Sequence, residues 1–231
     1  MCSLTPSLRP SRSTKSPPSG DPGLGKLQAA LASVLQLPHR EDQLRALELL
    51  QGFDDLASVA VPALVSLSRS SDPEVALSAF AALLKGVNGE VATVDLLERV
   101  NDCLNDYSGG SDSAALINIG GGLRKVTDAR SLSSMEALAA SRFVVIRRGA
   151  MQALRAMKNP PAGATLAARL DDSDKYVRYL AVISLAETFS KYGGYAPSMY
   201  LFNRNPEFYV GLWKSWWATE GRAYQPSSDV K

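Results

Sequence analysis

A pattern of helix starts recurs along the chain at intervals of about 30 to 40 residues, and it limits the fold more than any other feature. The clearest copy, "DDSDKYVRYLAVISLAETF", spans residues 171–189 and places Val177 and Ala181 on one face of a helix. Asp174 stands before this face at the position of an N-cap. Arg178 follows four residues later and is expected to reach back to Asp174. The pattern predicts a helix that begins at an acidic turn.

Other segments repeat these residue types in the same order. "FVVIRRGAMQAL" places Arg147 and Ala150 at the arginine and alanine positions, and "SDPEVALSAFAAL" places Asp72 at the cap position. Weaker copies begin near Glu41 and Ser111. Helices are therefore expected to start near residues 41, 72, 111, 141 and 172, with second helical segments at 56–68, 91–104, 128–139 and 163–170. Helix pairs at this period predict an all-α protein, an α-solenoid (α-α superhelix) of about four to five pairs.

Each repeated position has a physical role in this interpretation. Ala150 and Ala181 are expected at helix crossings, where a small side chain lets two backbones approach. The acids cap the helices and accept hydrogen bonds from the arginines of their own or a neighbouring repeat. Three departures break the pattern: Ala76 stands at an arginine position, Phe143 at a turn aspartate, and Glu48 at a small-residue position.

"DDSDKYVRYLAVISLA" and "SDPEVALSAFAALL" resemble HEAT repeats, in particular the short HEAT-like repeats first associated with phycobilisome (bilin) lyases. The resemblance covers residues 141–190 best, 70–105 less well and the rest weakly. It implies a non-catalytic scaffold or adaptor that holds a protein or peptide on its concave side, lined by the second helices. The alternative that it implies is a HEAT-like enzyme, such as a bilin lyase-like protein or a DNA glycosylase.

Composition limits the chemistry. The net charge of +2 argues against a nucleic-acid partner, since nucleic-acid-binding domains usually carry a clear basic excess. One histidine, His39, and one cysteine within a helical pattern, Cys103, offer little for a metal site or a Cys/His nucleophile. We therefore expect no catalytic, cofactor or metal residues. The longest apolar run, "LASVAVPALVSL", is shorter than the roughly 20 residues that span a bilayer, so no membrane span is expected.

Two glycine-containing segments invite a functional interpretation. "GDPGLGKL" has the spacing of a phosphate-binding loop, but Leu27 follows its lysine in place of Ser or Thr, and no strand precedes it. "NIGGGLRKV" contains Gly120–Gly122 inside a helical pattern and matches no dinucleotide fingerprint. A kink, a close contact between helices, or a place where a partner's backbone approaches remain the alternatives for these glycines.

All three tryptophans lie in "NPEFYVGLWKSWWATEG". Asn205 is expected to cap this helix, and Trp213, Trp216 and Trp217 share one of its faces. The last repeat of a solenoid has an open apolar face, so we interpret this helix as its cap. An aromatic binding pocket for a ligand or peptide is the alternative.

The chain is thus divided into a Ser/Pro-rich disordered tail (1–23), a HEAT-like repeat domain (24–192), a connecting arm with the capping helix (193–222) and a second disordered tail (223–231). The first tail also resembles an organellar transit peptide in its basic composition, although it has no secretory signal. A cytoplasmic monomer is expected. Arg148 and Arg155 are expected to face solvent and are the candidate binding residues.

Overall fold

The computed structural model describes residues 22–53, 58–86 and 94–223, and within these ranges it contains twelve α-helices and no strand. The helices are α1 (Pro22–Val34), α2 (Arg40–Gln51), α3 (Val61–Leu67), α4 (Pro73–Gly86), α5 (Val94–Asp106), α6 (Ala114–Leu123), α7 (Leu132–Ala139), α8 (Val144–Met157), α9 (Gly163–Ala168), α10 (Lys175–Thr188), α11 (Met199–Arg204) and α12 (Pro206–Thr219). The all-α prediction is confirmed for the described ranges.

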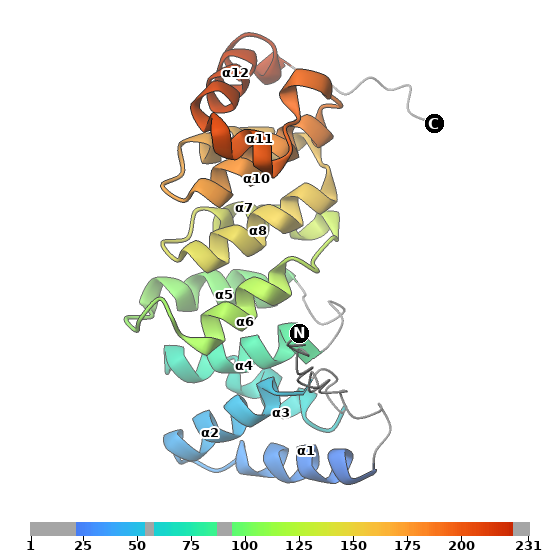
Figure 1. Ribbon diagram of the computed structural model, residues 1–231. Coiled ribbons are helices and arrows are strands. Elements are labelled where there is room, and N and C mark those ends of the chain that lie inside the picture. The colour runs from blue at the N-terminus through green and yellow to red at the C-terminus, as the bar shows by residue number, and fades with distance from the viewer. Residues whose placement is uncertain (1–21, 54–57, 87–93, 224–231) are drawn as a thin grey trace, which may run out of the picture.

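The helices stack in chain order along one direction, from α1 at one end to α12 at the other (Figure 1). The helices α2, α4, α6, α8 and α10, called the first row here, pack each against the next. The helices α3, α5, α7 and α9, called the second row, lie against the first row. All five first-row helices begin within about three residues of the predicted starts, a difference typical of helix boundaries. The chain therefore has a helical repeat-like fold.

A small buried residue occupies the same position in every first-row helix. It lies seven residues after the N-cap, and it is Ala46, Ala79, Gly120, Ala150 or Ala181, all of them buried. The prediction that Glu48 breaks this pattern is wrong. Because α2 begins at Arg40 with His39 as its N-cap, Ala46 takes the small-residue position and Glu48 is exposed.

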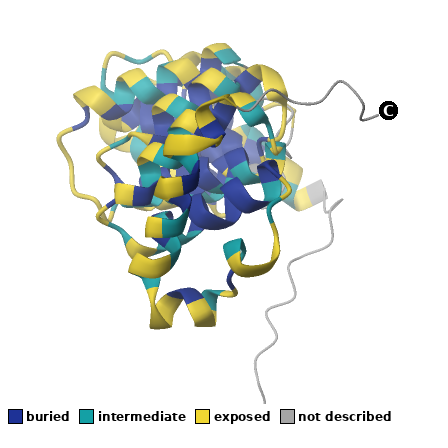
Figure 2. Ribbon diagram, turned by 90° about the horizontal axis from the view of Figure 1, so that it is seen from above, coloured by how far each residue is buried: buried dark blue, intermediate teal, exposed yellow. Residues whose placement is uncertain are grey.

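The core runs through the middle of the array. In α4, every residue from 75 to 84 is buried, because α2 and α6 flank this helix while α3 and α5 also pack against it. Figure 2 shows the buried residues in the interior and the exposed ones around the outside. A helix packed on several sides needs no polar face, which explains why "VALSAFAALL" has only one polar residue, Ser78.

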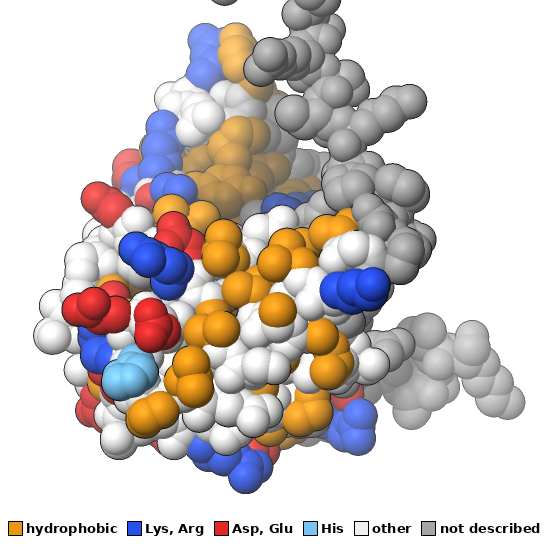
Figure 3. All heavy atoms as spheres, turned by 90° about the horizontal axis from the view of Figure 1, so that it is seen from below, with side chains coloured by type: hydrophobic (Ala, Val, Ile, Leu, Met, Phe, Trp, Pro, Cys, Tyr) orange, Lys and Arg blue, Asp and Glu red, His pale blue; other side chains and the backbone are white. Residues whose placement is uncertain are grey.

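The two ends of the array differ. Seen from the α1 end, hydrophobic side chains lie on the surface (Figure 3). Leu27 of α1, Leu49 of α2 and Leu37 between these two helices are exposed. At the other end, α12 packs on α9 and α10. None of the described helices is long and apolar enough to span a membrane.

The structure changes the proposed boundaries slightly. Pro22 and Gly23 belong to α1 and Ala223 to a final 3-10 turn (Gly221–Ala223), so these three residues are not part of a tail. The rest of both predicted tails lies outside the described residues. The arm between α10 and α12 contains the short helix α11, which the sequence analysis did not anticipate.

Candidate functional site

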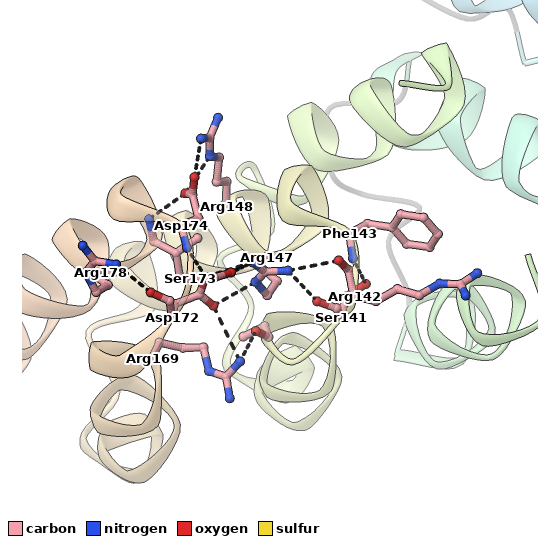
Figure 4. Close-up of polar contacts among 12 residues, drawn as sticks. Ser141, Arg142, Phe143, Arg147, Arg148, Arg169, Asp172, Ser173, Asp174 and Arg178 are labelled. Carbon is pink, nitrogen blue, oxygen red and sulfur yellow. Dashed lines mark hydrogen bonds and ion pairs between the residues drawn. The ribbon is translucent and has the colours of Figure 1, made fainter. Parts of the chain in front are cut away.

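The polar residues of the repeat motif meet at the turn between α9 and α10 (Figure 4). The Arg147 Nε and Nη2 atoms donate to the two carboxylate oxygens of Asp172, both at 2.8 Å. Its Nη1 donates to the backbone oxygens of Ser141 and Arg142 at 3.0 and 3.1 Å. The Arg147 side chain is 10% exposed and that of Asp172 is 3% exposed. This buried pair ties the turn before α8 to the turn before α10.

Asp174 is the N-cap of α10, and its Oδ1 accepts a hydrogen bond from Val177 N at 3.0 Å. Its charged partner is Arg148 of α8, which donates from Nε at 2.9 Å and from Nη2 at 2.6 Å. These hydrogen bonds from Arg148 hold the pKa of Asp174 below its usual value.

The expectation that Arg178 pairs with Asp174 is wrong. Arg178 instead donates to Asp172 O at 2.9 Å and approaches Glu207 of α12 at 4.0 Å. Asp174 is bound from the neighbouring repeat, because the start of α10 faces α8 and the Arg148 side chain reaches it from there.

Asp72 has an equivalent position before α4. Its Oδ1 accepts hydrogen bonds from Glu74 N at 2.9 Å and Val75 N at 3.1 Å, and Arg40 of α2 donates to its Oδ2 at 2.6 Å. Desolvation opposes the charge of Asp72, but the hydrogen bonds from Arg40 and the two amides outweigh it, so the pKa of Asp72 is lowered. Sequence reasoning missed Arg40, since its position at the first turn of α2 is not an arginine position of the motif.

Arg148 and Arg155, the candidate binding residues expected to face solvent, lie at the contact between α8 and α10. Both side chains are partly exposed, at 43% and 38%, but each is held in a two-point ion pair with α10. Arg155 donates to Glu187 at 3.0 Å from Nε and 2.6 Å from Nη2, which lowers the pKa of Glu187. The two residues therefore join α8 to α10.

Two of the three glycines in α6 lie where neighbouring helices come close. A Cβ on Gly120 would stand 2.5 Å from Val145 O of α8, and one on Gly122 would stand 2.6 Å from Leu84 Cβ of α4. Gly149 of α8 faces Gly120 with equally little space. Gly121 has open space around it. Of the alternatives above, close helix contact describes Gly120 and Gly122.

Two of the tryptophans are buried between α12 and the end of the array. Trp213 is 0% exposed and its indole N–H donates to Tyr195 O at 2.9 Å. Trp216 is 3% exposed, donates to Glu220 at 2.9 Å and lies 5.0 Å from Phe189 between ring centroids. Asn205 is the N-cap of α12 and accepts from Phe208 N at 3.3 Å.

Trp217 is only partly buried, and its ring borders an open groove of about 670 Å³. The residues that line this groove include Pro160, Pro161, Ala164, Phe189, Trp217 and Arg222. Glycines make room for the ring, since a Cβ on Gly163 would stand 2.7 Å from Trp217 Cη2 and one on Gly221 would overlap the same ring. This groove, called the Trp217 groove below, combines apolar walls with one cation.

Among the described residues, no three His, Cys, Asp or Glu side chains lie close enough together to hold a metal ion. Comparison of the sequence with models of protein families and with curated proteins gave no match. The resemblance to HEAT repeats thus depends on the motifs of the sequence itself.

Proposed function

We propose that the chain is a HEAT-like α-solenoid that acts as a non-catalytic scaffold, and that it binds a protein or peptide along the concave side formed by its second row. The observation that carries this proposal is the small buried residue repeated in all five first-row helices. A recurring crossing geometry of this kind generates the extended surface on which repeat proteins bind their partners.

Contacts between repeats support the same proposal. Arg40 and Arg148 each bind the aspartate that caps the next first-row helix. In the second row, Arg99 of α5 donates to Ser68 O beyond the end of α3, and Arg169 donates to Ala139 O at the end of α7. Such neighbour-to-neighbour bonds are what a chain of stacked units requires.

The solvent-facing side of α5, in the second row, is acidic. Asp95, Glu98 and Asp102 are spaced along one side of this helix, and all three are exposed. None of them forms an ion pair with another residue in the described ranges. A basic segment of a partner protein is complementary to this face, because opposite charges steer association and set the register.

Affinity capture with purified charge variants tests the proposal. The triple variant Asp95→Lys, Glu98→Lys and Asp102→Lys reverses the α5 face. The matched control, Glu41→Lys, Asp42→Lys and Glu48→Lys, reverses three exposed acids on α2. We expect wild type and control to retain a stoichiometric partner from the native extract and the α5 variant to lose it.

Circular dichroism and thermal melting first establish that both variants are folded. The proposal is rejected if the folded α5 variant retains the partner as well as the control does, or if wild type retains no stoichiometric partner.

A further inference from the structure

We infer that the Trp217 groove is a binding site for a peptide that ends in an aromatic residue, with the ring held in the groove and the terminal carboxylate bound by Arg222. The groove is lined by residues of α9 and the turn before it, by Phe189 directly after α10, and by the end of α12 with the turn that follows it. It is separate from the α5 face, so this inference does not depend on the proposed scaffold function.

The walls of the groove suit a flat apolar group. The rings of Trp217 and Phe189 line it with their centroids 6.1 Å apart at an interplanar angle of 52°, and Pro160, Pro161 and Ala164 also line it. A volume of about 670 Å³ is within the range of roughly 300–1,000 Å³ typical of ligand pockets. Aromatic side chains stack favourably on such surfaces.

The charge of the groove selects an anion. Arg222 is exposed and is the one charged side chain among the described residues that line the groove. It forms no hydrogen bond or ion pair with another described residue. A guanidinium offers a planar pair of donors that matches a carboxylate. Lys191 does not line the groove and pairs with Glu220 at 3.4 Å.

Trp217 differs from the other two tryptophans in its surroundings. The indole N–H of Trp213 and that of Trp216 bind acceptors within the protein, as described above. The Trp217 N–H forms no hydrogen bond with a described residue, and Trp217 is only partly buried. The indole N–H groups of Trp213 and Trp216 are therefore used inside the protein, whereas Trp217 lines the groove.

Ligand-detected NMR titration of the full chain with N-acetyl-L-phenylalanine tests the inference. For a ligand of this size we expect a dissociation constant on the order of 1 mM. The carboxamide analogue, N-acetyl-L-phenylalanine amide, is expected to bind at least about fivefold more weakly, because it lacks the charge that Arg222 recognises. Arg222→Gln is expected to cause the same loss, and Ala164→Trp, which fills the groove from exposed Ala164, is expected to abolish binding.

Arg204→Gln is the matched control, because Arg204 is an exposed arginine elsewhere on the cap, 5.9 Å from the centroid of the Tyr200 ring. It should leave binding unchanged. Three results would overturn the inference. The acid and the amide could bind with equal affinity, or Arg204→Gln could cause the loss instead of Arg222→Gln. The third is that no binding occurs at a ligand concentration 10-fold above the expected dissociation constant. Binding that occurs only in a full-length Tyr224→Ala variant would also overturn it and would assign the groove to the chain's own last residues.

Discussion

At the scale of single residues, two adjacent arginines of α8 have different surroundings and therefore different expected effects. Arg147 and Asp172 are almost fully buried, whereas the Arg148 side chain is 43% exposed. Removing one member of a buried ion pair leaves an uncompensated charge in the interior, which is strongly destabilising. An ion pair that water reaches contributes little.

The first prediction compares these two positions. Arg147→Met should lower the free energy of unfolding by about 3–5 kcal/mol. Arg148→Met should lower it by about 1 kcal/mol or less, because solvent screens this pair. Urea unfolding of both variants measures the difference. Equal losses would show that the burial of Asp172 has no energetic consequence.

The second prediction concerns pH. The pKa values of Asp174 and Glu187 are lowered in the folded chain by hydrogen bonds from Arg148 and Arg155. A lowered carboxyl pKa stabilises the fold above the unfolded values of about 4, and this stabilisation disappears as pH falls through the folded values. The double variant Arg148→Gln, Arg155→Gln should therefore be less stable than wild type at pH 6 and nearly equal to it well below pH 4.

Urea unfolding at both pH values tests this expectation. Arg142→Gln is the control, since the Arg142 guanidinium lies 4.6 Å over the Phe143 ring and forms no ion pair with a described acid. The difference in unfolding free energy between Arg142→Gln and wild type should not change with pH. A pH-independent deficit in the double variant would show that the two carboxyl groups do not carry the effect.

The third prediction tests the helix register. Ala181 is fully buried in α10, which packs against α8. Ala181→Leu adds volume to a closed site and should lower the free energy of unfolding by about 1–3 kcal/mol. A neutral result in thermal or urea unfolding would mean that Ala181 does not lie at a helix crossing.

At the scale of elements, α6 contacts both of its first-row neighbours through glycine. Three consecutive glycines weaken an isolated helix, so packing must support this one. Gly120 and Gly122 lie where α8 and α4 approach, whereas Gly121 faces open space. In α6, close helix contact therefore requires glycine at 120 and 122 but not at 121.

The fourth prediction uses this difference. Gly121→Ala should raise the free energy of unfolding by up to about 1 kcal/mol, because alanine favours the helix and its Cβ meets nothing within 4 Å. Gly120→Ala should lower it by at least about 1–3 kcal/mol, because its Cβ would press on Val145 O and force α6 away from α8. If both variants are more stable than wild type, α6 and α8 do not pack as closely at Gly120 as described.

At the scale of the whole molecule, aromatic side chains cover the α12 end. Polar contacts also join α11 and α12 to the rest of the array. Lys214 of α12 pairs with Asp171, and Lys175 of α10 donates to Asn203 O at 3.2 Å. Without α11 and α12, the faces of α9 and α10 that contact α12 would be open to water. Large exposed apolar faces promote association.

The fifth prediction follows from that exposure. Trp216→Ala should cost about 3–5 kcal/mol of unfolding free energy, as other large aromatic truncations in a core do. A chain that stops before Tyr195 should melt at lower temperature and self-associate in sedimentation experiments. A monomeric, equally stable truncated chain would contradict the capping role of α12 and leave ligand binding as its function.

The sequence by itself determined the helices of both rows and their order. Apolar periodicity and capping residues such as Asp174 and Asn205 act within one or two turns, so a linear sequence contains them in full. The small residue at the crossing of a first-row helix was also readable wherever the N-cap was correctly placed. Glu48 was misjudged because His39 was not recognised as the cap of α2.

Only the tertiary structure decided which side chains meet. Arg148 binds Asp174, Arg40 binds Asp72 and Gly120 faces Gly149, and each of these contacts joins residues of different helices. The Trp217 groove likewise depends on how α12 is rotated against α9 and α10. A sequence pattern places a residue on a face of its own helix, but the partner of that face depends on how neighbouring helices are rotated and how far apart they pack, and these are set by the side chains of all the helices together.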